Sequence, residues 1–190
     1  MHRRFSVRPT LMLRGRQFKG LRGFSGKPSH PPLTDFPVAA YVFAATFDVV
    51  SRVAGDDSAI GREFFVSATH VIVAGAAVSL FTAVTGFWDW LRSTEPGTQA
   101  RRTANWHMAV MLTVTVIVLV DIVVRIAQWS DHIATTPFVM VLSLVAGGLV
   151  AFGAAYGGTL VFDYGFNVET AGDSPVWHPS EIDVVPGRDR

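Results

Sequence analysis

Four long apolar stretches divide the chain, and short polar connections separate them. The apolar stretches cover residues 33–53, 64–91, 104–128 and 137–162. Each is close to or above the roughly 20 apolar residues that a helix needs to cross a bilayer. The third is rich in β-branched residues, but in lipid a helix satisfies its own backbone polar groups, whereas a lone strand does not. The pattern therefore predicts four transmembrane helices.

The connections between these spans predict how the helices are arranged. They read AGDDSAIGRE, RSTEPGTQARR and WSDHIATT. Connections this short place consecutive helices side by side in opposite directions. We therefore predict an all-α fold, an integral membrane four-helix up-down-up-down bundle over residues 33–163. A basic juxtamembrane arm (1–32) precedes this bundle, and a polar cytoplasmic tail (164–190) follows it.

The composition agrees with a membrane protein and excludes several classes of site. Of the 190 residues, 49% are hydrophobic and 16% charged, against about 25% charged in a typical soluble domain. The chain has no cysteine, which excludes disulfides, thiolate metal sites and cysteine-ligated iron–sulfur clusters. We find no hydrolase, kinase or glycine-rich phosphate-binding motif. We therefore expect no catalytic residue and a non-enzymatic function.

The net charge of +1 hides a strong asymmetry that predicts orientation. The arm before the first span carries eight basic residues, and Arg92, Arg101 and Arg102 add to the same side. Cytoplasmic segments carry the excess of Lys and Arg, so we expect both termini in the cytoplasm of a bacterial plasma membrane. The arm either lies on anionic lipids or is a disordered segment that only sets orientation. We expect no nucleic-acid partner, because the membrane is the nearer anion.

One group of polar residues is predicted at the cytoplasmic face of the bundle. It consists of His30, Asp35, Asp89, Arg101, Arg102 and His107. Ionisable residues in or beside spans are costly and suggest a function, here a pocket for a ligand headgroup. The alternative is interfacial anchoring, in which Asp35 caps the first helix and Asp89 pairs with one of the arginines. The spacing matches no metal-binding signature.

A second group is predicted toward the outer side, from Asp48, Asp121 and Arg125. Asp121 and Arg125 are four residues apart on one helix, so they share a face, and Asp48 of the first span is the expected partner of Arg125. His107 lies five turns before Arg125, so the third span presents one polar stripe to the interior. The alternatives are a functional site and an ion pair that locks the first and third helices. We interpret His70 as an interfacial histidine.

The fourth span carries small residues that favour close helix contacts. Gly153 and Gly157 form a GxxxG pair in GGLVAFGAAYGG, a pattern that lets helix backbones approach closely. The contact lies either inside the bundle or between copies of the chain. We therefore expect a membrane protein partner or a homo-oligomer.

Several motifs together resemble a known family. They are HPPLTDFPVAAYVFAATFD before and within the first span, TGFWDWL closing the second, ARRTANWH opening the third, and GGTLVFDYGFNV closing the fourth. From His30 to about Val168 the chain resembles the bacterial membrane family called domain of unknown function 2231, and LTDFP is similar to an actinobacterial variant. The family has no settled activity, and some relatives carry a Rieske domain. Many relatives have histidine in place of Asp35, and some near Thr159.

The resemblance implies a redox neighbourhood rather than a redox centre in this chain. We therefore predict an accessory or assembly subunit of a respiratory or other redox membrane complex. One alternative is a b-type haem cytochrome, with His30, His107 or His70 as candidate axial ligands. Another is a lipid, quinone or metal site at the cytoplasmic-face group.

Overall fold

The structure is a computed structural model that describes residues 20–23, 27–131 and 134–168. Four long helices make up these ranges: α1 (His30–Ala54), α2 (Ala59–Ser93), α3 (Gln99–Ala127) and α4 (Pro137–Gly158). A 3-10 turn, η2 (Trp129–Asp131), follows α3, and a π-helical turn, η3 (Thr159–Asp163), extends α4. The predicted all-α fold class is confirmed.

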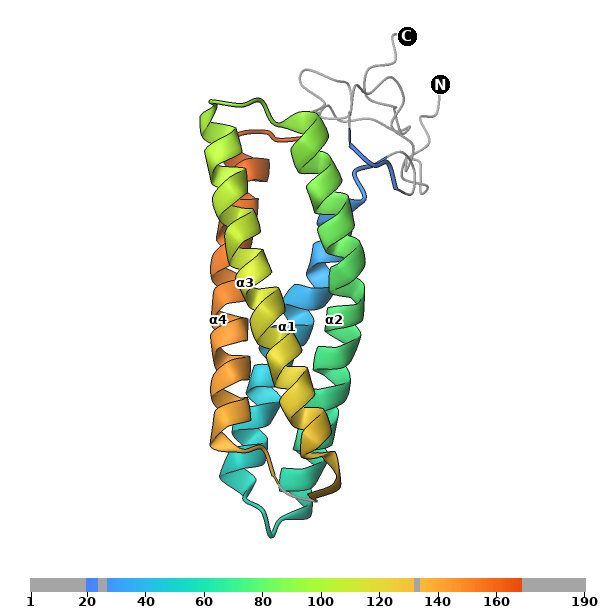
Figure 1. Ribbon diagram of the computed structural model, residues 1–190, viewed down its shortest axis with the longest axis vertical. Coiled ribbons are helices and arrows are strands. Elements are labelled where there is room, and N and C mark those ends of the chain that lie inside the picture. The colour runs from blue at the N-terminus through green and yellow to red at the C-terminus, as the bar shows by residue number, and fades with distance from the viewer. Residues whose placement is uncertain (1–19, 24–26, 132–133, 169–190) are drawn as a thin grey trace, which may run out of the picture.

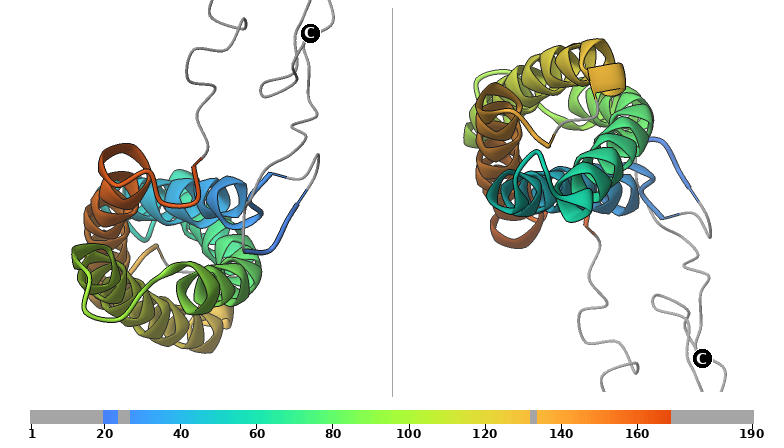
Figure 2. Two further views of the ribbon diagram at one scale, coloured as in Figure 1. Left: turned by 90° about the horizontal axis from the view of Figure 1, so that it is seen from above. Right: turned by 90° about the horizontal axis from the view of Figure 1, so that it is seen from below.

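The four helices form a ring in which consecutive helices run in opposite directions (Figure 1). Viewed along its length, the bundle has α1 and α3 at opposite corners, with α2 and α4 between them (Figure 2). The backbone contacts agree with this arrangement, because α1 packs against α2 and α4, and its backbone does not come close to that of α3. α3 runs obliquely, with its start beside α4 and its end beside α2 (Figures 1 and 2). Any side chains that join α1 and α3 must therefore cross the centre of the bundle.

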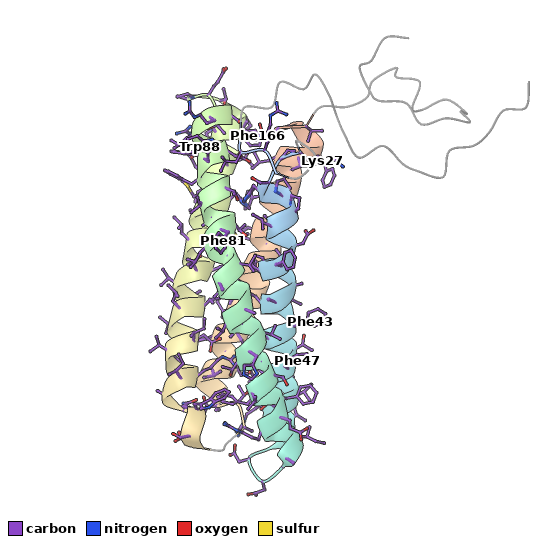
Figure 3. The ribbon with its side chains drawn as sticks, turned by 90° about the vertical axis from the view of Figure 1, so that its right-hand side faces the viewer. Lys27, Phe43, Phe47, Phe81, Trp88 and Phe166 are labelled. Atoms are coloured by element: carbon purple, nitrogen blue, oxygen red, sulfur yellow. The ribbon has the colours of Figure 1, made fainter. Side chains whose placement is uncertain are left out.

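The packing is that of a protein surrounded by lipid. All four helices are long and apolar enough to cross a membrane. A small core forms between them, centred on Tyr41, Ile72 and Val114. Large apolar side chains cover the outside instead, and Phe43 and Phe81 are 56% and 67% exposed on the side shown in Figure 3. Lipid tails solvate such side chains, so they need no cover from protein.

The two ends of the bundle differ, and we call them the terminal end and the distal end. The terminal end contains the start of α1, the connection from α2 to α3 and the end of α4, and Lys27 and Trp88 lie there (Figures 1 and 3). The distal end contains the other two connections. Most of the predicted basic arm and tail lies in residues 1–19 and 169–190, outside the described residues.

The first helix begins earlier than the apolar pattern predicts. α1 starts at His30, its N-cap is Ser29, and prolines occupy its first turn. Proline is favoured there because its missing N–H has no partner in the first turn. Asp35 therefore lies inside α1 and is exposed. The predicted capping role of Asp35 is wrong.

Candidate functional site

Polar side chains inside the bundle form two layers on the same two helices. His30 and Asp48 belong to α1, and His107 and Arg125 belong to α3, with 18 residues between the members of each pair. Eighteen residues make five turns, which puts each pair on one helix face with about 27 Å between its members. Because α1 and α3 run in the same direction, the histidines form a layer at the terminal end. The charged residues form a layer at the distal end.

The distal layer is a closed network of Asp48, Asp121 and Arg125, which we call the distal cluster. All three side chains are 0% exposed. Arg125 donates from Nε to Asp121 Oδ1 at 2.9 Å and from Nη1 to Asp48 Oδ1 at 3.1 Å. Its Nη2 donates to the second oxygen of each carboxylate. One guanidinium thus bridges two carboxylates, and its bonds to Asp48 cross the bundle from α3 to α1.

Neutral groups complete the surroundings of this network. The Thr135 hydroxyl donates to Asp48 Oδ1 at 2.8 Å, and Thr69 Oγ1 lies 3.4 Å from Arg125 Nη1 as a further acceptor. The guanidinium carbon also lies 5.8 Å from the ring centroid of Phe65. Arginine has five N–H donors, and the five bonds described here leave none of them without an acceptor.

The connection between α3 and α4 seals the distal cluster from the end of the bundle. Ala134 and Thr135 are 1% and 0% exposed. The Thr135 N–H donates to Ser51 Oγ at 2.9 Å, and that hydroxyl donates to the carbonyl of Gly61 at 2.5 Å. The Ala134 N–H donates to Asp56 Oδ1 at 3.0 Å. Hydrogen bonds to Ser51 of α1 and to Asp56 of the connection between α1 and α2 therefore hold this segment in place.

At the terminal end, both histidines are fixed by the backbone of a neighbouring helix. His30 Nδ1 lies 3.0 Å from the Thr82 carbonyl oxygen of α2, and His107 Nδ1 lies 2.8 Å from the Gly153 carbonyl oxygen of α4. A carbonyl only accepts hydrogen bonds, so each Nδ1 carries the proton. In the neutral ring this leaves Nε2 with a free lone pair.

A glycine on the neighbouring helix makes room for each imidazole. A Cβ atom at Gly86 would lie 2.6 Å from His30 Cε1, and one at Gly157 would lie 3.3 Å from His107 Cε1. Gly157 and Gly153 belong to the GxxxG pair, so in this chain that pair packs against α3 inside the bundle. Both histidines are partly exposed.

The remaining residues of the predicted cytoplasmic-face group do not join the histidines in one network. Asp89 of α2 is 4% exposed, and its Oδ1 accepts the backbone N–H of Leu21 at 3.3 Å. This bond ties the segment before α1 to the end of α2. Asp35 is exposed on α1.

The two arginines of that group bind at the connection between α2 and α3. Arg101 donates to Thr94 Oγ1 at 2.6 Å and stacks on Trp90, 3.6 Å from the ring centroid. Arg102 is exposed and donates to Gln99 Oε1 at 2.7 Å. Within the described ranges neither forms an ion pair with the aspartate of α2, so the predicted pairing is wrong.

His70 belongs to the distal half of the molecule, on α2. It is exposed, and its ring meets that of Trp129 edge to face at 5.7 Å between centroids. It therefore lies in neither layer and shares no site with His30 or His107.

Two residues that complete the distal layer could not be recognised as part of it from the sequence. Thr69 lies in an apolar span and Thr135 lies in the polar connection before α4, and nothing in their spacing indicates a charged partner. The equal spacing of 18 residues in α1 and α3 is a signal that could have paired the two layers. It becomes informative once the two helices are known to be parallel and to face each other.

Comparison with known proteins identifies the family. The family described as "Predicted membrane protein (DUF2231)" matches residues 26–170, a range that includes both layers. No curated protein and no solved structure matches the chain. Since the match covers more than half of its length, the chain belongs to this family of predicted membrane proteins of unknown function.

Proposed function

We propose that the protein is a membrane-embedded b-type cytochrome that holds a haem between His30 and His107. The supporting observation is the paired arrangement of the two imidazoles on opposite corners of the bundle. Each donates its Nδ1–H to a backbone carbonyl, which is how metal-ligating histidines are usually oriented. Helical bundles commonly hold cofactors with side chains from facing helices.

The number of available ligands favours haem over a bare metal ion. A protein-bound metal ion such as zinc needs three or four protein ligands. In the part of the chain that the structure describes, no group of three His, Cys, Asp or Glu side chains could hold a metal ion. The porphyrin itself supplies most of the ligands of haem iron, so two histidines from the protein would suffice.

The residues of this layer have distinct roles in the proposal. His30 and His107 would ligate the iron through Nε2, and the carbonyls of Thr82 and Gly153 orient the two rings. Gly86 leaves space for the ring of His30. A bound haem supplies one-electron transfer. The accessory role in a respiratory or redox complex stays a prediction, and it fits a small cytochrome that exchanges electrons with a membrane partner.

An absorbance spectrum of the purified protein tests this function. The full chain is produced with an ample haem supply and purified in a mild detergent. We expect a Soret band, sharp α and β bands on reduction with dithionite, and a pyridine haemochrome of haem b. A purified chain without a Soret band under these conditions would contradict the proposal.

Single histidine variants identify the ligands. We expect His30→Ala and His107→Ala each to lose the low-spin spectrum, because each would remove one protein ligand of the iron. His70→Ala is the matched control, since His70 is exposed and lies in neither layer, and it should keep the wild-type spectrum. A wild-type spectrum in both His30→Ala and His107→Ala would show that any bound haem is held elsewhere.

A further inference from the structure

The distal cluster contains one more acid than base. Asp48 and Asp121 are fully buried, and Arg125 is the cation that bonds to both. If both carboxylates were ionised, the cluster would carry one net negative charge in a sealed site inside a membrane protein. An uncompensated buried charge is strongly unfavourable even after the protein relaxes, and groups in such sites neutralise instead.

The elements around the cluster supply no second cation among the described residues. α2 contributes the hydroxyl of Thr69 and the ring of Phe65, the connection before α4 contributes the hydroxyl of Thr135, and α4 has no charged residue. The next cation, Arg62, stacks on Phe65 and Trp129.

The other two arginines of the distal half lie outside the cluster. Arg62 donates to a backbone carbonyl and forms no ion pair with either buried carboxylate. Arg52 is 4.0 Å from Asp56 at the end of α1, and both of these side chains are exposed. Neither arginine neutralises the extra acid.

We infer that the distal cluster is a proton-binding site, with the proton carried by Asp121. The two carboxylates differ in the hydrogen bonds that they accept. Asp48 accepts two N–H groups of Arg125 and the hydroxyl of Thr135, whereas Asp121 accepts Nε at 2.9 Å and a longer bond from Nη2 at 3.3 Å. Asp48 accepts more hydrogen bonds and stays ionised, so the proton resides on Asp121. This inference is independent of haem binding.

Infrared spectroscopy of the full chain in detergent or lipid tests the inference directly. A protonated carboxylic acid has a carbonyl stretch above the amide I band that shifts in D₂O, and an ionised carboxylate does not. We expect the wild type at neutral pH to show such a band and to lose it in alkaline buffer. A wild-type spectrum without it at neutral pH would overturn the inference.

Two variants assign the band to the cluster. Asp121→Asn removes the protonated group, and Asp48→Asn leaves Asp121 as the sole acid beside Arg125, so Asp121 ionises. Each variant should therefore lose the same band, and Asp48→Asn carries the test if Asp121→Asn does not fold. Asp35→Asn, an exposed position on α1, is the control and should leave the band unchanged. A band that persists in either folded cluster variant assigns the proton elsewhere and refutes the site.

Discussion

At the scale of single residues, the chemistry of Arg125 explains why the distal cluster needs arginine. Its planar guanidinium offers donors in a fixed fork, and it bonds two carboxylates from different helices at once. Lysine would bring a single ammonium point charge and fewer donors. Since the side chain is 0% exposed, water cannot replace any bond that is lost.

Replacing Arg125 by glutamine should destabilise the protein strongly. The change leaves Asp48 and Asp121 buried without their cation, and removing one partner of a buried ion pair costs about 3–5 kcal/mol. Chemical denaturation in detergent, followed by circular dichroism, measures the difference. Arg125→Lys keeps the charge and should lie between the wild type and Arg125→Gln. A wild-type unfolding midpoint for Arg125→Gln would show that the cluster contributes little to stability.

The sequence predicted the partners of charged residues inside the spans better than those of charged residues at the end of the bundle, for a physical reason. A charge inside a span must find a partner, so Asp121 and Arg125 at four-residue spacing, with Asp48 opposite, had few alternatives. Asp89 and Arg101 lie at the end of the bundle, where backbone groups, aromatic rings and headgroups all compete as partners. Charge complementarity alone therefore gave the wrong pairing there.

At the scale of elements, the helices were predictable and their ends were not. An apolar run shows only the part of a helix that lies inside the bilayer. α2 begins at Ala59 and α3 at Gln99, each about five residues before the apolar runs that start at 64 and 104. Those turns form because the helix continues into the interface. The start of α1 was missed because prolines, which normally break helices, are accepted in a first turn.

The packing of α1 against α2 should depend on the absence of a side chain at Gly86. In Gly86→Ala the new methyl group would lie 2.6 Å from His30 Cε1, so the ring must move and its bond to the Thr82 carbonyl is strained. We expect an altered or lost haem spectrum. Gly148→Ala on α4 is the control, since a Cβ there meets nothing within 4 Å, and its spectrum should be that of the wild type. Identical spectra for both variants would contradict this placement of His30.

At the scale of the whole molecule, the bundle has one sealed end and one end that carries the histidine layer. The segment 134–135 closes the distal end over the distal cluster. α1 starts and α4 finishes at the terminal end (Figure 1), so the described part of the basic arm, next to α1, lies on the side of His30 and His107. If positive charge sets the orientation, the histidine layer faces the cytoplasm, and electrons would enter or leave the proposed haem from that side.

Cysteine labelling in cells tests this orientation, because the chain has no cysteine of its own. Asp57 and Glu95 are exposed on the distal and terminal connections, respectively. With a membrane-impermeant maleimide, we expect Asp57→Cys to react in intact spheroplasts and Glu95→Cys to react only after permeabilisation. The reverse pattern would place the histidine layer on the outer face of the membrane, and the partner in electron transfer would then be sought outside the cytoplasm.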